Sequence, residues 1–339
     1  MPLIDEENNL VDIHLMGDVA DNFSIREGLI IDKNGDQWYL WRTDGLDSWW
    51  RFFEEIIDAP MGRKLANAGC DEEEYLLRSG ELDFSGFFRK KKAKAAMQYR
   101  WNLHGWGSPN LDPPSFDSTS LIPLFAGILQ ADIERINSER YRMLWEQKSV
   151  ETTFLTLDKS NIPIPKATPM NQLEESGEPM VLELERGWKI DGLSHILLPI
   201  GVFNRLEESC VGLIANVGDD ERNSWPKFSE GFLAIAIACK RLFIAGEELF
   251  LAADVEGWVD SCKSFFGSKG FSYPIRAKSL DSNGGIELQF KTISCLAVTV
   301  GYLAGAWVRC EGRPVKVGVE QTDDLDIIRL ESRHEISHT

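Results

Sequence analysis

This chain repeats itself, and the repeat limits the folds open to it more than any other property. Residues 41–46 (WRTDGL) return as 188–193 (WKIDGL), and residues 66–72 (ANAGCDE) return as 215–221 (ANVGDDE). Further on, 124–129 (LFAGIL), 145–147 (WEQ) and 154–157 (FLTL) align with 298–303 (VTVGYL), 319–321 (VEQ) and 327–330 (IIRL), so that Gly127 matches Gly301. Matches in one order with similar gaps predict two copies of one folding unit.

Each predicted copy places helices before a pair of strands. A long apolar helix is expected at 121–136 and again at 293–309, and two strands follow in both places. Residues 315–319 (VKVGV) alternate between valine and other residues, which is typical of a strand with one buried face. The sequence therefore predicts an α+β fold of two tandem copies, each an antiparallel sheet covered by helices, which pack as a pseudo-dimer.

Glycines predict some of the local geometry. The Asp-Gly pairs at 44–45 and 191–192 are expected to form turns, because glycine adopts a positive φ at low cost. Gly69 and Gly218 are expected to be the residues that end helices.

Prolines mark the predicted boundary between the copies. Pro163, Pro165, Pro169 and Pro179 interrupt any regular element in this stretch. The predicted domains are an N-terminal α+β repeat over 1–160, a Pro-rich linker over 161–180, a C-terminal α+β repeat over 181–332 and a flexible tail over 333–339.

The charge of the chain narrows its partners. The formal net charge is −18, and a surface this acidic repels nucleic acid and anionic membranes over most of its area. We therefore expect no nucleic-acid and no membrane partner. An apolar small molecule or a peptide is the expected ligand, and a homodimer is the expected assembly if the chain self-associates.

The cysteines and the N-terminus favour a soluble protein of the cytoplasm. The six cysteines form no C-x-x-C pair, and several lie in apolar runs, as expected of buried thiols in a reducing compartment. The first residues lack the basic and apolar regions of a signal peptide. The uncharged stretch 293–308 is shorter than the roughly 20 residues that a bilayer core requires, so a buried helix is predicted there.

The C-terminal copy resembles the 4-vinyl reductase domain, a small-molecule-binding fold of regulators that is related to vesicle-tethering subunits. The matching pattern is a glycine-bearing apolar helix (301–305, GYLAG), a loop through Gly312, a strand ending in Glu320 and a last strand over 326–330. In the N-terminal copy, 62–66 (GRKLA) within 52–68 resembles an early stretch of that family.

The chain departs from that family where cysteines are common. One such cysteine follows the strand glutamate, where this chain has Gln321, and another lies in the last strand, near Asp326 and Ile327. A function that depends on this cysteine pair is thereby in doubt. The resemblance implies an apolar ligand pocket and dimerisation through helices, and it implies no particular reaction.

Two groups of residues are the candidate ligand contacts. Trp101, His104 and Trp106 lie in an aromatic-rich turn, where indole offers a large apolar area and one hydrogen-bond donor. Gly301, Tyr302 and Gly305 lie on the apolar helix of the C-terminal copy. For both groups the alternative interpretation is packing inside the core.

A zinc-protease motif near the C-terminus is rejected. His334, Glu335 and His338 form a formal H-E-x-x-H, in which two histidines on one helical face bind zinc. A single residue of the chain follows, so no third ligand comes from downstream, and we expect a solvated tail without metal. No cofactor is predicted.

Two other charged features remain open. The only basic run, 89–94 (RKKKAK), is interpreted as a solvated helix face, with docking of an acidic partner or an anion as the alternative. Glu146 and Glu320 occupy equivalent strand ends, and a hydrogen-bonding role is expected unless the two carboxylates approach one another.

These observations favour binding over chemistry. No serine-hydrolase, phosphate-binding or dinucleotide-binding signature is present, so no catalytic residue is proposed, and a non-enzyme is favoured while an enzymatic role stays open. The leading hypothesis is a non-catalytic binding or regulatory protein that holds an apolar small molecule or a peptide in a pseudo-symmetric pocket. The alternatives are an enzyme or accessory factor of tetrapyrrole (vinyl) reduction, and a scaffold subunit of a protein assembly.

Overall fold

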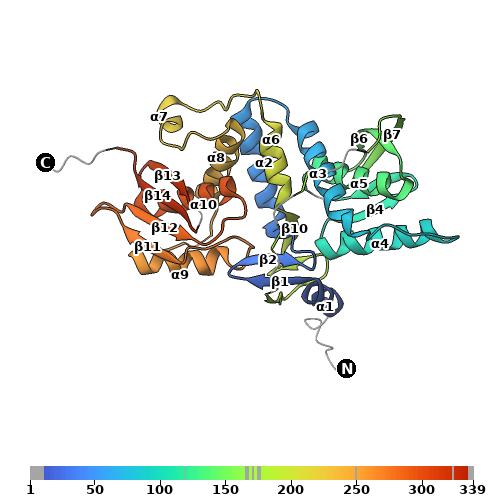
Figure 1. Cartoon of the computed structure of the whole chain (residues 1–339), viewed down its shortest axis with the longest axis horizontal. Helices are drawn as coiled ribbons and strands as arrows, with labels where there is room; N and C mark the ends of the chain where they lie inside the picture. The colour runs from blue at the N-terminus through green and yellow to red at the C-terminus, as the bar shows by residue number, and fades with distance from the viewer. Residues whose placement is uncertain are drawn as a thin grey trace, which may run out of the picture. The chain divides into compact units, whose positions relative to one another are not determined.

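The computed structural model describes residues 11–118, 120–164, 168–169, 172–173, 177–248, 250–322 and 324–334 (Figure 1). Helices and antiparallel sheets are combined, which confirms the predicted α+β class. The chain forms two compact units that interleave in sequence. Unit 1 comprises Met1–Arg26, Ile30–Asp47 and Met61–Arg205, and unit 2 comprises Glu27–Leu29, Ser48–Pro60 and Leu206–Thr339.

The first sheet of unit 1 has the strand order β8-β1-β2-β3-β10-β9. Its strands are β1 (Phe23–Arg26), β2 (Leu29–Asp32), β3 (Gln37–Arg42), β8 (Glu178–Pro179), β9 (Lys189–Ile190) and β10 (Leu193–Pro199). β3 and β10 pair antiparallel, with Trp41 opposite Ile196. Residues 38–41 of β3 (WYLW) are all buried, because apolar side chains point to both faces of this strand. A short helix, α1 (Ile13–Asn22), precedes the sheet and is capped by Asp12.

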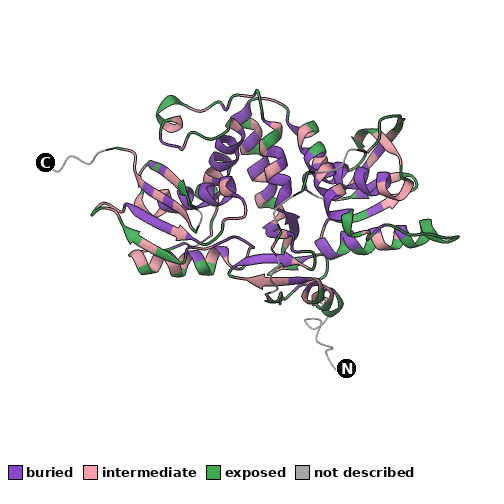
Figure 2. Cartoon of the chain, in the orientation of Figure 1, coloured by how far each residue is buried: buried purple, intermediate pink, exposed green. Residues whose placement is uncertain are grey.

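The second sheet of unit 1 has the strand order β4-β5-β7-β6 and is accompanied by helices. Its strands are β4 (Ser108–Leu111), β5 (Pro114–Asp117), β6 (Arg140–Gln147) and β7 (Thr152–Ser160). The helices are α3 (Gly62–Leu76), with a short 3-10 turn η2 (Leu77–Ser79) after it, α4 (Arg89–His104) and α5 (Ile122–Asn137). α5 is almost completely buried from Leu124 to Glu134 (Figure 2).

Unit 2 has one sheet with the strand order β11-β12-β14-β13. Its strands are β11 (Arg276–Ser279), β12 (Ile286–Phe290), β13 (Val315–Gln321) and β14 (Asp326–Ser332). Its helices are α7 (Asp219–Arg222), α8 (Glu230–Ala245), α9 (Val255–Phe266) and α10 (Leu296–Glu311). Two further helices, α2 (Thr43–Ile57) and α6 (Gly201–Ser209), contribute residues to both units.

The two units share one order of elements. Helix, helix, hairpin, helix and hairpin follow one another as α3-α4-β4-β5-α5-β6-β7 in unit 1 and as α8-α9-β11-β12-α10-β13-β14 in unit 2. The C-terminal matches of the repeat lie in register on these elements. Gly127 and Gly301 are the sixth residues of α5 and α10, and β6 and β13 both end in Glu-Gln.

Both matched glycines lie where two helices touch. A Cβ added to Gly127 would lie 1.9 Å from the Ala66 carbonyl oxygen of α3, and one added to Gly301 would lie 2.3 Å from the Ala236 carbonyl oxygen of α8. Only glycine allows backbones to approach this closely. The duplication as a whole and the pseudo-dimer stay predictions.

The N-terminal matches of the repeat do not lie on equivalent elements. Residues 41–46 form the end of β3 and the start of α2, whereas 188–193 span β9, the turn after it and the first residue of β10. Residues 66–72 are the interior of α3, whereas 215–221 are a loop and the start of α7. Short stretches that contain glycine and polar residues can be alike in sequence and still form different elements, which explains why these matches do not lie on equivalent elements.

The glycine predictions are partly wrong for the same reason. Residues 44–45 lie inside α2 rather than in a turn, while Asp191 and Gly192 do turn, with φ of 51° and 74°. Gly69 lies within α3, where an added Cβ would lie 2.8 Å from the Leu124 carbonyl oxygen, so its role is helix packing rather than helix termination. Gly218 precedes α7 as its N-cap.

The predicted domain boundaries differ from the units of the structure. β8, β9 and β10 follow the Pro-rich stretch in sequence, yet they belong to the first sheet of unit 1. Segments 27–29 and 48–60 belong in turn to unit 2. A boundary read from prolines assumes that each domain is continuous, and these two units are not.

Candidate functional site

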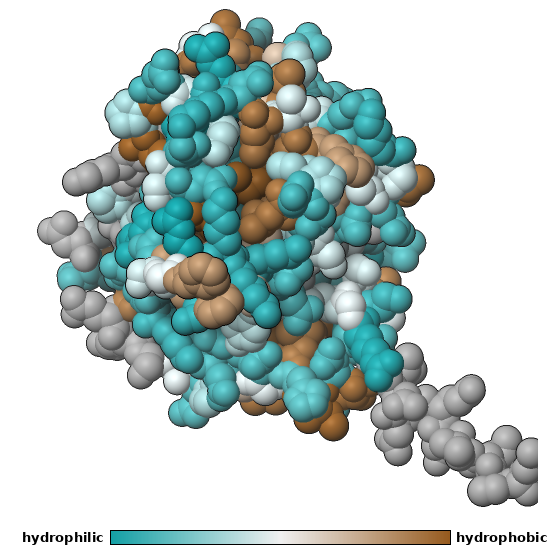
Figure 3. All heavy atoms as spheres, turned by 90° about the vertical axis from the view of Figure 1, so that its right-hand side faces the viewer, coloured by the Kyte–Doolittle hydropathy of each residue, from teal (hydrophilic) through white to brown (hydrophobic). Residues whose placement is uncertain are grey.

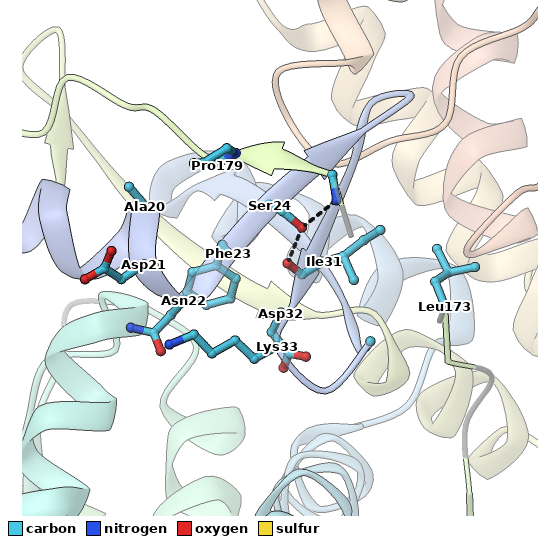
Figure 4. A pocket seen from close by; sticks show the side chains of 12 residues that line it. Ala20, Asp21, Asn22, Phe23, Ser24, Ile31, Asp32, Lys33, Leu173 and Pro179 are labelled. Carbon is cyan, nitrogen blue, oxygen red and sulfur yellow. Dashed lines mark hydrogen bonds between the residues drawn. The ribbon is translucent and has the colours of Figure 1, made fainter. Parts of the chain in front are cut away.

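A cavity of about 250 Å³ lies in unit 1 beside the β2–β3 turn, and we call it the Asp32 pocket (Figure 4). Its walls come from the end of α1, from β1 and β2, and from the segment around β8. Figure 4 shows Asn22, Phe23, Asp32 and Lys33 around the opening. The Ser24 hydroxyl donates to the Ile31 carbonyl oxygen at 3.4 Å and accepts from the Gly177 amide at 3.3 Å, so these hydrogen bonds hold the wall together.

The Asp32 carboxylate is already engaged by its own turn. It accepts from the amides of Asn34 (2.8 Å) and Asp36 (3.0 Å) and from the Trp38 indole (3.1 Å). Burial and the negative charge of Asp36 raise the pKa of Asp32 to about 6, although these hydrogen bonds pull the other way. The carboxyl group holds the turn in place and titrates close to neutral pH.

A stack of three aromatic rings lies behind this pocket. The His104 ring stacks on both Trp38 and Trp106, with 4.5 Å between ring centroids in each pair, and the two indoles are 6.2 Å apart. The edge of Phe23 packs against both Trp38 and His104. Burial and the nearby Arg100 guanidinium lower the pKa of His104 well below its usual value, so the imidazole is neutral. Its Nδ1 lies 2.6 Å from the Arg100 carbonyl oxygen and therefore carries the proton.

A buried charge network adjoins the aromatic stack. Arg100 donates two hydrogen bonds to the Glu73 carboxylate, at 2.6 and 2.9 Å, and a third to Glu81 at 2.7 Å. The Trp101 indole donates to Asp132 at 2.7 Å. Burial and the charge of Glu73 raise the pKa of Asp132 well above its usual value, so this carboxyl is kept protonated. The network fixes α3, α4 and α5 to one another.

A larger cavity of about 470 Å³ lies in unit 2, and we call it the Phe250 pocket. Its lining combines apolar residues with hydroxyl groups and one ion pair: Glu248, Phe250, Leu251, Ser261, Ser264, Phe265, Ser268 and Lys269. The ammonium group of Lys269 lies 3.7 Å from the centroid of the Phe265 ring and 2.8 Å from the Glu248 carboxylate. The Ser261 hydroxyl donates to the Leu251 carbonyl oxygen, which ties α9 to the preceding loop.

An aromatic cluster supports the Phe250 pocket from behind. Phe250 packs against Trp258 at 5.3 Å and against Phe265 at 5.9 Å between ring centroids. Deeper in the unit, Tyr302 of α10 packs against Phe266 at 6.2 Å and against Phe271 at 5.1 Å. These rings interlock edge to face, which gives the pocket a rigid apolar floor.

The predicted ligand residues fall into three separate settings. Trp101, His104 and Trp106 are brought together, but they are buried in the core of unit 1 and line neither pocket. Gly301 and Gly305 face α8, so they serve helix packing. Tyr302 belongs to the aromatic cluster behind the Phe250 pocket.

The other candidate residues stay apart from both pockets. Glu146 forms an ion pair with Lys148, and Glu320 forms one with Arg329 at 2.9 Å. His334 is exposed, while Glu335 and His338 lie outside the described residues. Among the described residues, no group of histidine, cysteine, aspartate and glutamate side chains could hold a metal ion.

The cysteines are ordinary buried thiols. Cys70, Cys210, Cys239, Cys262 and Cys295 are buried, and Cys310 is partly exposed. Burial raises the pKa of Cys295 to about 12, with Cys70 and Cys239 also raised, which leaves the thiol form inert.

Sequence reasoning missed both pockets. The Asp32 pocket is lined by segments far apart in the chain, and the Phe250 pocket is lined by a loop and the helix after it, which enclose a space only once they fold against each other. Comparisons with protein families, with curated proteins and with solved structures give no match. Among the helices of the described part of the chain, none has the length and apolar character to cross a membrane.

Proposed function

We propose that the protein is a binding protein, and that the Phe250 pocket of unit 2 holds a small apolar or aromatic molecule. The observation that carries this proposal is the pairing of a cavity of about 470 Å³ with a floor of interlocked aromatic rings. Small-molecule sites are typically concave, mostly apolar and provided with a few polar groups that orient the ligand. Ser264, Ser268 and Lys269 are the polar groups at this cavity.

The lining of the pocket favours binding over catalysis. Its ionisable side chains are Glu248 and Lys269, and these two neutralise each other in one ion pair. A nucleophilic or acid–base mechanism requires a group that is activated by a neighbouring base or acid, and the two ionisable groups of this lining contact each other instead. A regulatory or carrier role therefore agrees better with this site than a reaction does.

Two predictions from the sequence, the family resemblance and the location in the cytoplasm, form part of the same proposal. The resemblance to the 4-vinyl reductase domain is consistent with an apolar pocket beside the glycine-bearing helix, since Tyr302 packs into its supporting cluster. The proposed site lies within unit 2 alone, whereas the sequence predicts a pseudo-symmetric pocket. The buried free cysteines support a location in the cytoplasm.

The proposal is tested with 8-anilinonaphthalene-1-sulfonate, an aromatic anion that fluoresces when it leaves water. We expect saturable binding to the native protein with one site per chain, accompanied by a rise in melting temperature. Ser264→Trp places an indole in the cavity and should abolish the binding, because Ser264 is an exposed lining residue on α9. Ser282→Trp, in an exposed turn of the same unit, is the matched control and should bind as the native chain does.

Two results would contradict the proposal. The first is a native protein with no saturable fluorescence change under conditions where its circular dichroism shows a folded state. The second is equal binding by the Ser264→Trp and Ser282→Trp variants, since the dye would then occupy another surface.

A further inference from the structure

The N-terminal end of α4 carries an unusual surface, which we call the α4 tip (residues 84–94). Two of its three phenylalanines are the most conspicuous feature, since Phe87 is 96% exposed and Phe88 is 63% exposed. The two rings meet edge to face, 5.2 Å apart. Residues 89–92 and Lys94, which follow directly, are all cationic. A concentrated patch of this kind stands out in a chain with a net charge of −18.

The α4 tip is presented on a firm base. The C-terminal half of α4 is anchored by Met97, Trp101 and His104, all of which are buried. Figure 2 shows the change along this helix, from exposed at the tip to buried at its other end. Figure 3 faces this side of the molecule, where small apolar patches lie among mostly hydrophilic side chains. The tip is therefore held in place and open to solvent.

The charges of the tip do not serve the stability of the helix. Cations in the first turn oppose the helix dipole, and Phe88 provides no side-chain cap for the free amides. Among the described residues, no carboxylate lies within ion-pair distance of Arg89, Lys91 or Lys92. The acidic neighbours are already engaged, since Asp83 pairs with Arg135 and Glu139 pairs with Lys159. A feature that the fold does not need points to a partner outside the chain.

We infer, contrary to the expectation from the net charge, that the α4 tip docks on an anionic lipid membrane surface, with Phe87 and Phe88 inserted at the headgroup level and the basic residues on the phosphates. A lipid interface offers an apolar layer directly beneath a layer of negative charge, which matches the adjacency of rings and cations here. It also yields around a convex tip, whereas a protein partner would need a preformed groove. At physiological salt the Debye length is about 8 Å, so the acidic rest of the chain repels the membrane surface only where it comes within about that distance.

The test is flotation of the purified full-length chain with vesicles of phosphatidylcholine alone or with about 30% phosphatidylserine. We expect binding to the phosphatidylserine vesicles that weakens with added salt, and no binding to phosphatidylcholine alone. Phe87→Ser with Phe88→Ser should lower the partition coefficient by about tenfold or more, because the rings no longer enter the interface. Lys90→Glu with Lys91→Glu and Lys92→Glu should lower it by about 100-fold or more.

Matched variants separate the tip from general stickiness. Val211→Ser with Ile214→Ser removes two other exposed apolar residues, 84% and 75% exposed, and should leave vesicle binding unchanged. Lys316→Glu removes one exposed cation of unit 2 and should also leave it unchanged. Circular dichroism of each variant verifies that it is folded, which is expected for substitutions of exposed residues.

Three outcomes would overturn the inference. Equal binding to both kinds of vesicle would show that charge is not recognised. Unchanged binding in the tip variants would place the membrane contact elsewhere. Absence of vesicle binding, with tip-dependent binding of polyglutamate instead, would assign the tip to an acidic protein partner.

Discussion

Units 1 and 2 have their helices and strands in a similar order, but different kinds of side chain fill their cores. In unit 1, α5 buries carboxyl and amide groups after its matched glycine, including Asp132 at 0% exposure. In unit 2, the residue of α10 in register with Asp132 is Ala306, which is also fully buried. Unit 1 thus ties its helices together with the Arg100–Glu73–Asp132 network, while unit 2 relies on aromatic rings around Tyr302.

This difference shows that the helix–hairpin arrangement does not dictate the contents of its core. Backbone closeness at Gly127 and Gly301 is common to both units, so the helix pairs form for the same steric reason. What fills the remaining space then decides the properties of each unit. A charge network is sensitive to partner loss and to pH, whereas a cluster of rings can border an apolar cavity.

The largest expected effect comes from removing the central cation of unit 1. Arg100→Met should destabilise the protein by about 3–5 kcal/mol, because it leaves the Glu73 carboxylate buried without its partner. Urea unfolding followed by circular dichroism measures the change. Arg142→Met, on the exposed side of β6, is the matched control and should change stability by less than about 0.5 kcal/mol. Similar small losses in both variants would show that the network contributes little.

The second prediction tests the close helix contact at a glycine that both units have. Gly127→Ala and Gly301→Ala should each cost about 1–3 kcal/mol, because the new methyl group meets a backbone carbonyl of the neighbouring helix. Gly17→Ala in α1 is the control. It meets no atom within 4 Å, and alanine is the better helix former, so it should stabilise by about 0.4–1 kcal/mol. A loss at only one of the two matched glycines would break the comparison between the units.

The sequence predicted the parts of the fold that depend on periodicity. The helix around Gly301 and the following hairpin were placed correctly, because a buried apolar face and alternating valines leave a direct imprint on the sequence. Gly69 misled the prediction, since a glycine that allows helix contact looks the same in sequence as one that ends a helix. Only the packing partner, Leu124, distinguishes the two roles.

The candidate site was less predictable than the fold. The aromatic segment around His104 was identified, but the sequence does not reveal that the imidazole stacks on Trp38 and Trp106 and is buried. The Phe250 pocket depends on a loop and a helix whose rings meet only after folding. A concave surface depends on how such segments fold against each other, and no local sequence pattern reports it.

The third effect concerns pH and belongs to unit 1. The folded-state pKa of Asp32, about 6, is above its usual value of 3.8, so the folded state binds this proton more tightly than the unfolded state does. Its contribution to stability is present below pH 4 and is lost as the pH rises from about 4 to about 6. Asp32→Asn keeps an acceptor for the turn amides and should reduce the fall in melting temperature over this range. Asp117→Asn, an exposed site on β5, should leave the pH profile unchanged.

The smallest effect contrasts the helices that occupy equivalent places in the two units. α9 follows electrostatic rules, since Asp254 caps its first turn at 2.7 Å and Lys263 lies in its last turn, whereas α4 begins with a run of cations. Lys91→Glu should therefore stabilise the protein by about 0.3–1 kcal/mol, while Lys263→Glu should destabilise it by a similar amount. Urea unfolding in low salt measures both changes. If the two substitutions change the stability in opposite directions, the cations at the α4 tip cost stability, as expected of a surface retained for binding. If both change it in the same direction, this argument for a docking role is lost.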